Sequence, residues 1–449
     1  MVNRLNNWFA RQQRVGQWPW MLCGWLVLAS WVQAGAPEPY GENFVRLGES
    51  WPDAGPVLSL LESTPVAAQD GASYRQQVSE LEREGGPYAN TLAEPLAGLG
   101  RLHRQNGDIA EAQRHYQRAL HVVRVNDGLY SERQLPILRA LFESYRLSGD
   151  LQALDERYDY FFRLYGSGRP PHTPVRLGAT TEYLRWQREA LRLNASEDDK
   201  ARLLAAYQLN EQVLERVSGD ESVDLPAYRK LVMSQVRNLY LLEHRYAPRK
   251  ESLAVTSNPI FATVWDDTDF AQKQLEVIRR NGLARGRTLL EQLIARTPSE
   301  ATVELARAYL ELADWNQWNG RTEEAQDSYK RVVSLLRQGN REDLLSQWLA
   351  GSVELPANGA FWQPRPEPDS EQAVVVTTHY DISEEGRVAN IQMAEAQAEA
   401  GADQARTERN ERQAYKLRRR LKQTRFRPRF INGHAEAEQQ LVRSYQLID

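Results

Sequence analysis

The chain has 449 residues, of which 41% are hydrophobic and 26% charged, and its formal net charge at pH 7 is −4. This length allows two or three domains. A slightly acidic chain has no bulk affinity for nucleic acid, so no nucleic-acid partner is expected. The single cysteine, Cys23, excludes a disulfide framework, and stability must therefore come from packing.

The first 34 residues predict an export signal. Three arginines precede an apolar run over residues 18–32, and the run is followed by a small residue, Ala34, at a suitable cleavage point. The run is shorter than the ~20 residues that a membrane-spanning helix needs. We therefore expect a Sec-type signal peptide and a periplasmic protein. An uncleaved anchor, which would hold the protein at the inner membrane facing the periplasm, is the alternative.

Residues 73–166 carry the pattern of tetratricopeptide repeats. Leu99, Gly100 and Ala112 are small or apolar where two antiparallel helices would cross, and Gly107 begins the turn between them. A second turn begins at Gly149, so the two turns are further apart in the sequence than the usual repeat period of about 34 residues. We therefore expect helices somewhat longer than those of a standard repeat.

The rest of the chain divides by composition. The predicted order is residues 1–34, a signal peptide or anchor; 35–72, an irregular N-terminal segment; 73–166, repeats; 167–350, a helical array with a further repeat near 301–337; 351–370, a proline-rich linker; and 371–449, a small C-terminal domain. The predicted fold class is mostly α, an antiparallel helical-hairpin array, with a C-terminal α+β domain of order β-β-α-β. Such an array presents an inner face that binds peptides or other proteins.

The C-terminal domain resembles the C-terminal domain of TonB-family proteins. The resemblance is carried by a hairpin with the turn Glu385-Gly386-Arg387-Val388, a polar helix, the Phe426-Arg427-Pro428 element with a downstream Asn432-Gly433, and a closing strand. It implies a periplasmic domain that binds a partner's extended segment by strand addition at a sheet edge. It implies no catalytic residue.

The sequence contains none of the patterns that mark common catalytic or cofactor sites. No Gly-x-Ser-x-Gly elbow, phosphate-binding glycine loop or His-Glu-x-x-His motif is present. His103, His115 and His121 cluster, but the last two lack the spacing of three or four residues that places two metal ligands on one helix face. We therefore expect no enzyme activity, no cofactor and no metal site.

Two sets of residues are candidates for binding. The expected protein-binding residues are Arg101, Arg104 and Gln105 on the inner face of a repeat, Arg427 and Arg429 after the last helix, and Val442, Arg443, Ser444, Tyr445 and Gln446 on the final strand. As the last strand it either ends a sheet and exposes an edge, or it is paired or capped by its own chain. The expected basic patch is Arg418, Arg419, Arg420, Lys422 and Arg425. A basic patch that functions would meet an anionic surface, and a solvated face is the alternative.

These features predict a non-enzymatic scaffold of the Gram-negative envelope whose partners are periplasmic proteins or peptides, with an outer-membrane protein or an anionic envelope surface as further candidates. The alternative is a TonB-type energy transducer that couples an inner-membrane motor to outer-membrane receptors for transport. Two departures count against it. The apolar run has Ser30 but no histidine, where such transducers carry a Ser/His pair, and the proline-rich spacer is short.

The export signal predicts a new N-terminus close to Gly35. N-terminal sequencing of the protein from its native cell envelope should begin there, and the protein should wash off as soluble material. Retention of residues 1–32 together with resistance to salt and carbonate washing would instead favour the anchored transducer.

Overall fold

The computed structural model describes residues 37–39, 44–50, 71–193, 195, 198–245, 267–360, 375–393 and 404–447. The predicted signal peptide and the second half of the predicted linker lie outside these residues. Within them, no helix is long and apolar enough to cross a membrane.

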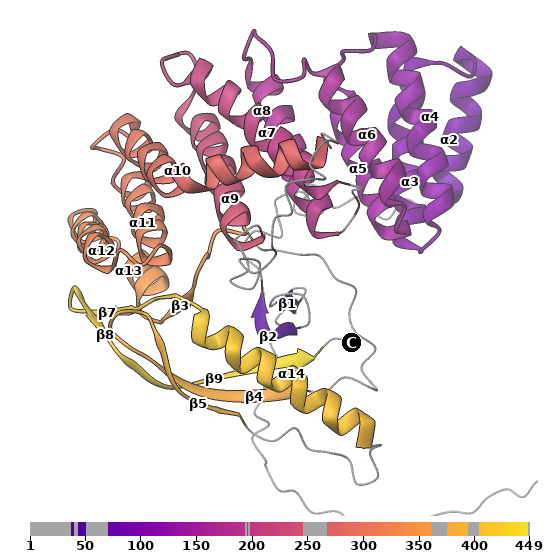
Figure 1. Cartoon of the computed structure of the whole chain (residues 1–449). Coiled ribbons are helices and arrows are strands. Elements are labelled where there is room, and N and C mark those ends of the chain that lie inside the picture. Colours follow the sequence, from indigo (N-terminus) through magenta and orange to yellow (C-terminus); the bar gives the residue numbers. More distant parts are fainter. Residues whose placement is uncertain are drawn as a thin grey trace, which may run out of the picture. The chain divides into compact units, whose positions relative to one another are not determined.

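Residues 71–349 form antiparallel helical hairpins (Figure 1). The helices are α2 Gly71–Gly85, α3 Ala93–Gln105, α4 Ile109–Asp127, α5 Gln134–Ser148, α6 Leu151–Leu164, α7 Pro174–Arg192, α8 Asp199–Val217, α9 Leu225–Arg245, α10 Asp267–Arg296, α11 Thr302–Trp318, α12 Thr322–Gln338 and α13 Glu342–Leu349, with a short 3₁₀ turn at Asn90–Leu92. The predicted fold class, a helical-hairpin array with a small C-terminal domain of strands and one helix, is confirmed.

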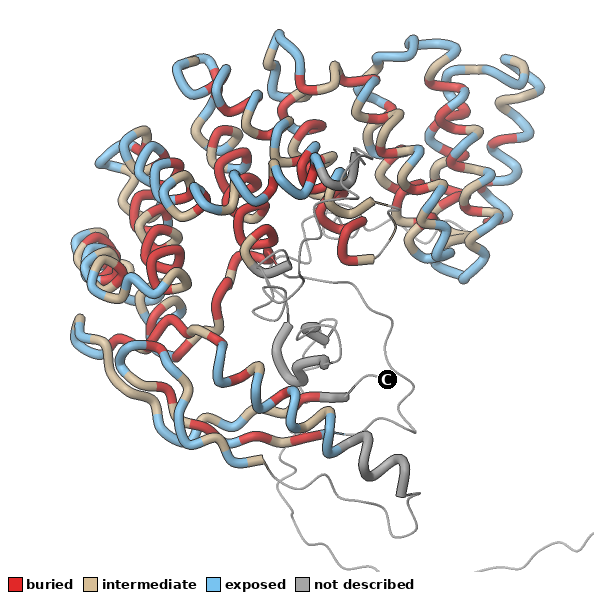
Figure 2. The backbone as a smooth tube through the Cα atoms, in the orientation of Figure 1, coloured by how far each residue is buried: buried red, intermediate tan, exposed pale blue. Residues whose placement is uncertain are grey.

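Small residues allow the helices of a pair to approach closely. A Cβ at Gly100 would lie 2.6 Å from Cε1 of Tyr116, so only glycine fits beneath this buried ring. Leu99, Ala112 and Tyr116 are all buried, as their repeat positions predict. Figure 2 shows buried residues gathered where neighbouring helices face one another.

The first helices of successive pairs lie side by side, and we call α3, α5, α7, α9 and α11 the first-helix row. Arg139 of α5 donates to Glu182 of α7, and Arg188 of α7 donates to the Ser234 hydroxyl of α9 at 2.8 Å. The row ends where the rings of Tyr240 and Trp315 join α9 to α11. Neighbouring first helices are thus tied by specific side-chain contacts, which fixes the surface that the row presents.

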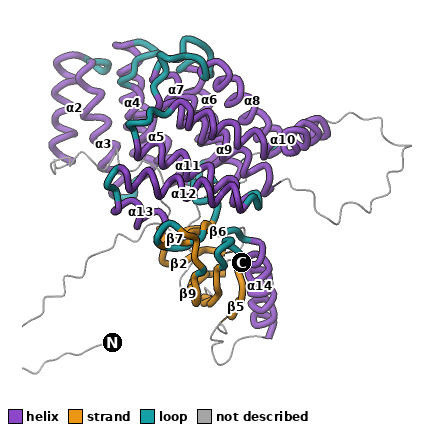
Figure 3. Tube along the Cα trace, turned by 90° about the vertical axis from the view of Figure 1, so that its left-hand side faces the viewer, coloured by secondary structure: helices purple, strands orange, loops and turns teal. Residues whose placement is uncertain are grey.

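The C-terminal domain is built on a five-stranded antiparallel sheet of order β1-β2-β9-β4-β5. Its strands are β1 Pro37–Pro39, β2 Phe44–Ser50, β4 Val375–Ile382, β5 Val388–Met393 and β9 Glu438–Leu447, and its helix is α14 Gln404–Gln423. Leu417 and Leu421 of α14 pack with Tyr380 and Ile382 of β4 in a separate small core. Figure 3 shows α14 beside the orange strands of this domain.

The final strand does not end the sheet, so the expectation of a free edge there is wrong. Tyr445 and Gln446 of β9 pair with Val376 and Val375 of β4 on one side and with Arg46 and Val45 of β2 on the other. The second neighbour comes from the far N-terminal part of the chain. An edge is formed instead by β5, which pairs with β4 alone among the described strands.

A buried ion pair joins the C-terminal domain to the helical array. Arg427 lies in β6 (Phe426–Arg427), and its Nε and Nη2 donate to the two carboxylate oxygens of Asp314 in α11 at 2.9 and 2.5 Å. The two residues are 6% and 4% exposed. Burial disfavours the charge of Arg427, but Asp314 outweighs this effect and raises the pKa of the guanidinium. Arg427 is therefore an interior residue, and its expected role in binding a partner at the surface is wrong.

Further polar contacts complete this joint. Tyr329 donates to Asp314 at 2.8 Å, and Arg427 Nη1 donates to the Trp348 carbonyl at 2.9 Å. A Cβ at Gly386 would lie 1.9 Å from the Phe426 carbonyl oxygen, so the hairpin turn can touch β6 only as glycine. The strand β6 pairs with β3, Val353–Glu354. Two further short strands, β7 Arg429–Ile431 and β8 His434–Glu436, pair with each other.

Replacement of Arg427 by alanine should destabilise the junction strongly. The change leaves the Asp314 carboxylate buried without its cation, which typically costs about 3–5 kcal/mol. Urea unfolding, with hydrogen exchange read in α11 and at residues 426–427, measures the effect. The matched control is Arg429→Ala, because Arg429 forms a more exposed, 3.6 Å pair with Glu436 that is worth under about 1 kcal/mol. Equal losses in the two variants would contradict a special role for the buried pair.

Candidate protein-binding groove

Two adjoining cavities lie at the N-terminal end of the first-helix row. Their volumes are about 310 and about 580 Å³, and Glu94, Arg101 and Arg133 line both of them. The smaller cavity separates α3 from α5, and the larger one extends towards Tyr74 of α2. We call the two cavities together the N-terminal groove.

Small and apolar side chains form the floor of the N-terminal groove. Ala97 of α3 faces Pro136, Ile137 and Ala140 of α5 across the smaller cavity. These short side chains leave the space between two otherwise adjacent helices unfilled. An apolar floor with a few polar groups around it is the usual character of a ligand site.

Arg101, one of the predicted protein-binding residues, lines both cavities. Arg104 lies one turn further along α3 and is half-buried, and Gln105 is exposed and lines neither cavity. The Nε atoms of Arg101 and Arg104 are buried and meet no acceptor within the described residues. Arg104 lines neither cavity, so Arg101 is the arginine of α3 that reaches the groove.

Arg133 was missed by the sequence prediction, because it lies in the connector before α5 rather than at a repeat position. Its Nη1 donates to Asp127 at 2.7 Å and to Asn90 at 3.0 Å, and these bonds hold it at the mouth of the groove. Its position could have indicated this role. Arg133 is the residue just before α5, and from there its side chain reaches the cavity beside α3.

Further along the row, the chain's own backbone occupies the equivalent surface. Arg237 of α9 donates to the Asn358 carbonyl at 2.6 Å, and Arg192 of α7 donates to the Ala360 carbonyl. Ala360 is fully buried against the array. The first helices thus bind a non-helical segment by donating from arginine side chains to its carbonyl oxygens.

The remaining predicted residues lie in the C-terminal domain and form no common site. Arg443 lies 3.6 Å from Glu354, Ser444 bonds Thr377, Tyr445 is fully buried, and Val442 is 53% exposed. In the predicted basic patch Arg418, Arg419 and Lys422 are exposed, while Arg420 and Arg425 are half-buried. Burial, followed by the charge of Arg387, lowers the pKa of Arg425.

The histidine cluster offers no metal site. The rings of His103 and His115 stack with centroids 5.2 Å apart, and His103 Nδ1 lies 3.4 Å from Asp108. The described part of the chain holds no group of three or more side chains placed to bind a metal ion. Burial, and then the charges of His103 and nearby arginines, lower the pKa of His115 below its ordinary 6.5.

Comparison with solved structures finds a protein described as a kinesin light chain of Podosopora anserina with nearly identical TPR-like repeats. The similarity covers 56% of this chain and 98% of that chain, with 17% sequence identity and a TM-score of 0.36, and a variant of the same protein matches equally. A similarity at this TM-score is too weak to support a conclusion about the fold. The evidence for the repeat architecture is therefore the set of helix contacts described above. No known family matches the sequence, and no curated protein matches it.

The lowered pKa of His115 predicts that the N-terminal repeats lose stability in acid. The unfolded chain binds a proton near pH 6.5 and the folded chain only below it, so the free energy of unfolding falls as the pH drops from 6.5 through the folded pKa. Urea titrations from pH 7.5 to 5 measure this fall, and His115→Gln should make it shallower. The same pH dependence in both proteins would contradict the assignment.

Proposed function

We propose that the chain is a non-enzymatic scaffold that binds an extended segment of a partner protein in the N-terminal groove. The observation that carries the proposal is the pair of arginines, Arg101 and Arg133, that line both cavities beside an apolar floor. The segment held by Arg192 and Arg237 supports it, because the same row of helices binds backbone carbonyls there. Arg101 and Arg133, which line both cavities, would bind the carbonyls or a carboxylate of the partner.

The proposed location is the periplasm, on the strength of the N-terminal arginines and short apolar run in the sequence. The TonB-like character of the C-terminal domain belongs to the same proposal. The strand order β5-β4-β9, with the helix between β5 and β9 in the chain, suits the predicted β-β-α-β arrangement. An anchored energy transducer remains the second candidate, because the helical array supplies length that the short proline-rich spacer lacks.

A library of ten-residue peptides selected against the purified full chain tests the groove. Replacement of both Arg101 and Arg133 by glutamine should weaken the selected peptides about tenfold or more, because a hydrogen bond to a charged group contributes about 1.5–3 kcal/mol. Fluorescence anisotropy of labelled peptides measures the dissociation constants.

The matched control is Arg114→Gln in α4, the second helix of the same pair. Arg114 is exposed and contacts Glu111 on its own helix, so its loss should leave the affinity unchanged. If the peptides bind the double variant as tightly as the unaltered chain, the groove is not the binding site.

A further inference from the structure

The N-terminal groove contains a carboxylate that has no partner among the described residues. Glu94 lies in the first turn of α3, is exposed, and lines both cavities of the groove. Two arginines line the same cavities, but neither forms an ion pair with Glu94. Within the described ranges Arg133 is paired with Asp127, and Arg101 has no acidic partner. The groove therefore holds one unpaired acid and one unpaired base.

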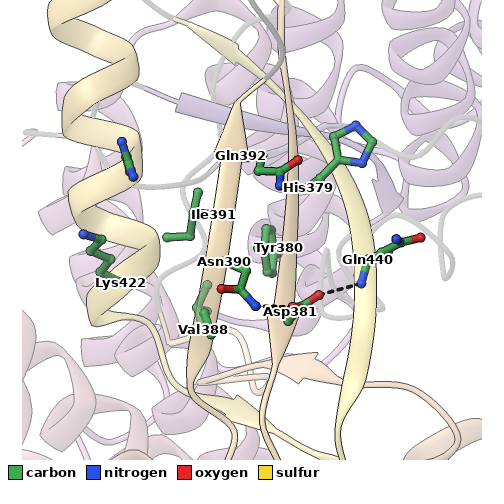
Figure 4. A pocket seen from close by; sticks show the side chains of 11 residues that line it. His379, Tyr380, Asp381, Val388, Asn390, Ile391, Gln392, Lys422 and Gln440 are labelled. Carbon is green, nitrogen blue, oxygen red and sulfur yellow. Dashed lines mark hydrogen bonds between the residues drawn. The ribbon is translucent and has the colours of Figure 1, made fainter.

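The cavity of the C-terminal domain, of about 660 Å³, has a carboxylate of a different kind (Figure 4). Both oxygens of Asp381 accept hydrogen bonds, from the Asn390 side chain at 2.6 Å and from the Gln440 backbone at 2.8 Å. Both donor residues have positive φ, and the pairing of β4 with each neighbour shifts register at this point. Asp381 thus stabilises an irregular part of the sheet, whereas Glu94 makes no such contact in the described part of the chain.

Glu94 and Arg101 lie on the same face of α3. They are seven positions apart, which is nearly two turns, so their Cα atoms are about 10 Å apart at ~1.5 Å per residue. Ala97 lies between them and belongs to the apolar floor. A ligand that lies along α3 therefore meets a negative charge, a short apolar stretch and a positive charge.

We propose that the partner segment carries a basic side chain that pairs with Glu94 and, three positions away, an acidic side chain that pairs with Arg101. This charge pattern presupposes that the groove binds a partner segment, and it specifies the chemistry of that segment. A polyproline II conformation suits it, because side chains three positions apart lie on one edge about 9 Å apart. This conformation needs no neighbouring strand. Apolar residues on its next edge would face Ile137 and Ala140 of α5.

Two other roles of Glu94 lead to different expectations. An acid in the first turn of a helix stabilises that helix through its dipole, and this role involves no ligand. A groove that binds only anions, through its arginines, would be weakened by Glu94, so removal of the carboxylate would strengthen the binding of acidic peptides. Only the pairing role makes the affinity for a lysine-containing peptide depend on Glu94.

Two twelve-residue peptides of proline and alanine test this pairing on the full chain. The first carries a lysine and a glutamate three positions apart, and in the second a glutamine replaces the lysine. The first should bind about fivefold more tightly, which is the upper range for a solvent-accessible ion pair. Glu94→Gln should abolish this difference and change the affinity of the second peptide less than about twofold. Fluorescence anisotropy of the labelled peptides measures the dissociation constants.

Glu132→Gln is the matched control, because Glu132 is exposed beside Arg133 but lines neither cavity. This variant should keep the preference for the lysine peptide. Absence of binding by the first peptide, equal affinity of the two peptides for the unaltered chain, or loss of the preference in Glu132→Gln would overturn the pairing.

The arginine double variant separates failure of the pairing from failure of the proposed function. If Arg101→Gln with Arg133→Gln weakens both peptides while Glu94→Gln keeps the preference for lysine, the groove binds a segment but Glu94 does not select its charge. If the double variant binds both peptides as tightly as the unaltered chain, the groove is not the binding site, and both proposals are wrong.

Discussion

The ion pair between Asp314 and Arg427 is the constraint on which the joining of the two parts of this protein depends. A buried pair recovers its desolvation cost only when the geometry is good and the remaining polar atoms are satisfied. Here both carboxylate oxygens are used, Tyr329 adds a third donor, and Arg427 also reaches the Trp348 carbonyl. The contacts of Arg427 with Asp314 and Trp348 require β6 to sit at one position beside α11 and α13. The ion pair therefore fixes the position of β6 at least as much as it stabilises the fold.

This fixed position has a consequence for the first-helix row. After β3, which pairs with β6, residues 358–360 lie against α7 and α9, where Arg192 and Arg237 donate to their carbonyl oxygens. The first-helix row thus has two parts. At α7 and α9 a segment of the same chain covers it, whereas at α3 and α5 a cavity remains open. The two stretches share arginine donors, and they differ in whether a segment of the chain already lies on them.

The helical array was predictable because its determinants are local. Gly100 and Tyr116 meet within one hairpin, and glycine turns mark the ends of the helices, so a repeat pattern contains both. Arg101 was predicted as a protein-binding residue for the same reason. Arg427 was not predictable, because its alternation with other arginines suggests a solvated surface. Nothing near it in the sequence indicates that Asp314, more than a hundred residues earlier, is its partner.

The strands at 37–39 and 44–50 were missed for a related reason. Proline and glycine nearby indicate an irregular segment, and the partner strand lies at the other end of the chain. A period-two pattern shows that a segment can be a strand but not with which strand it pairs. The length of a helix is set by neighbouring residues, whereas the order of a sheet is set by the whole chain.

The pairing of Arg46 with Tyr445 also bears on how the molecule is made. A ladder between the two ends of the chain has the largest sequence separation available, and such contacts form late because a long loop must close first. The helical hairpins, whose contacts are local, can form while the rest of the chain is still being synthesised. The sheet can be completed only after β9 has been synthesised, so β2, which pairs with β1 on its other side, lacks its second partner until then. The pairing of the last strand with the first ones therefore completes the fold.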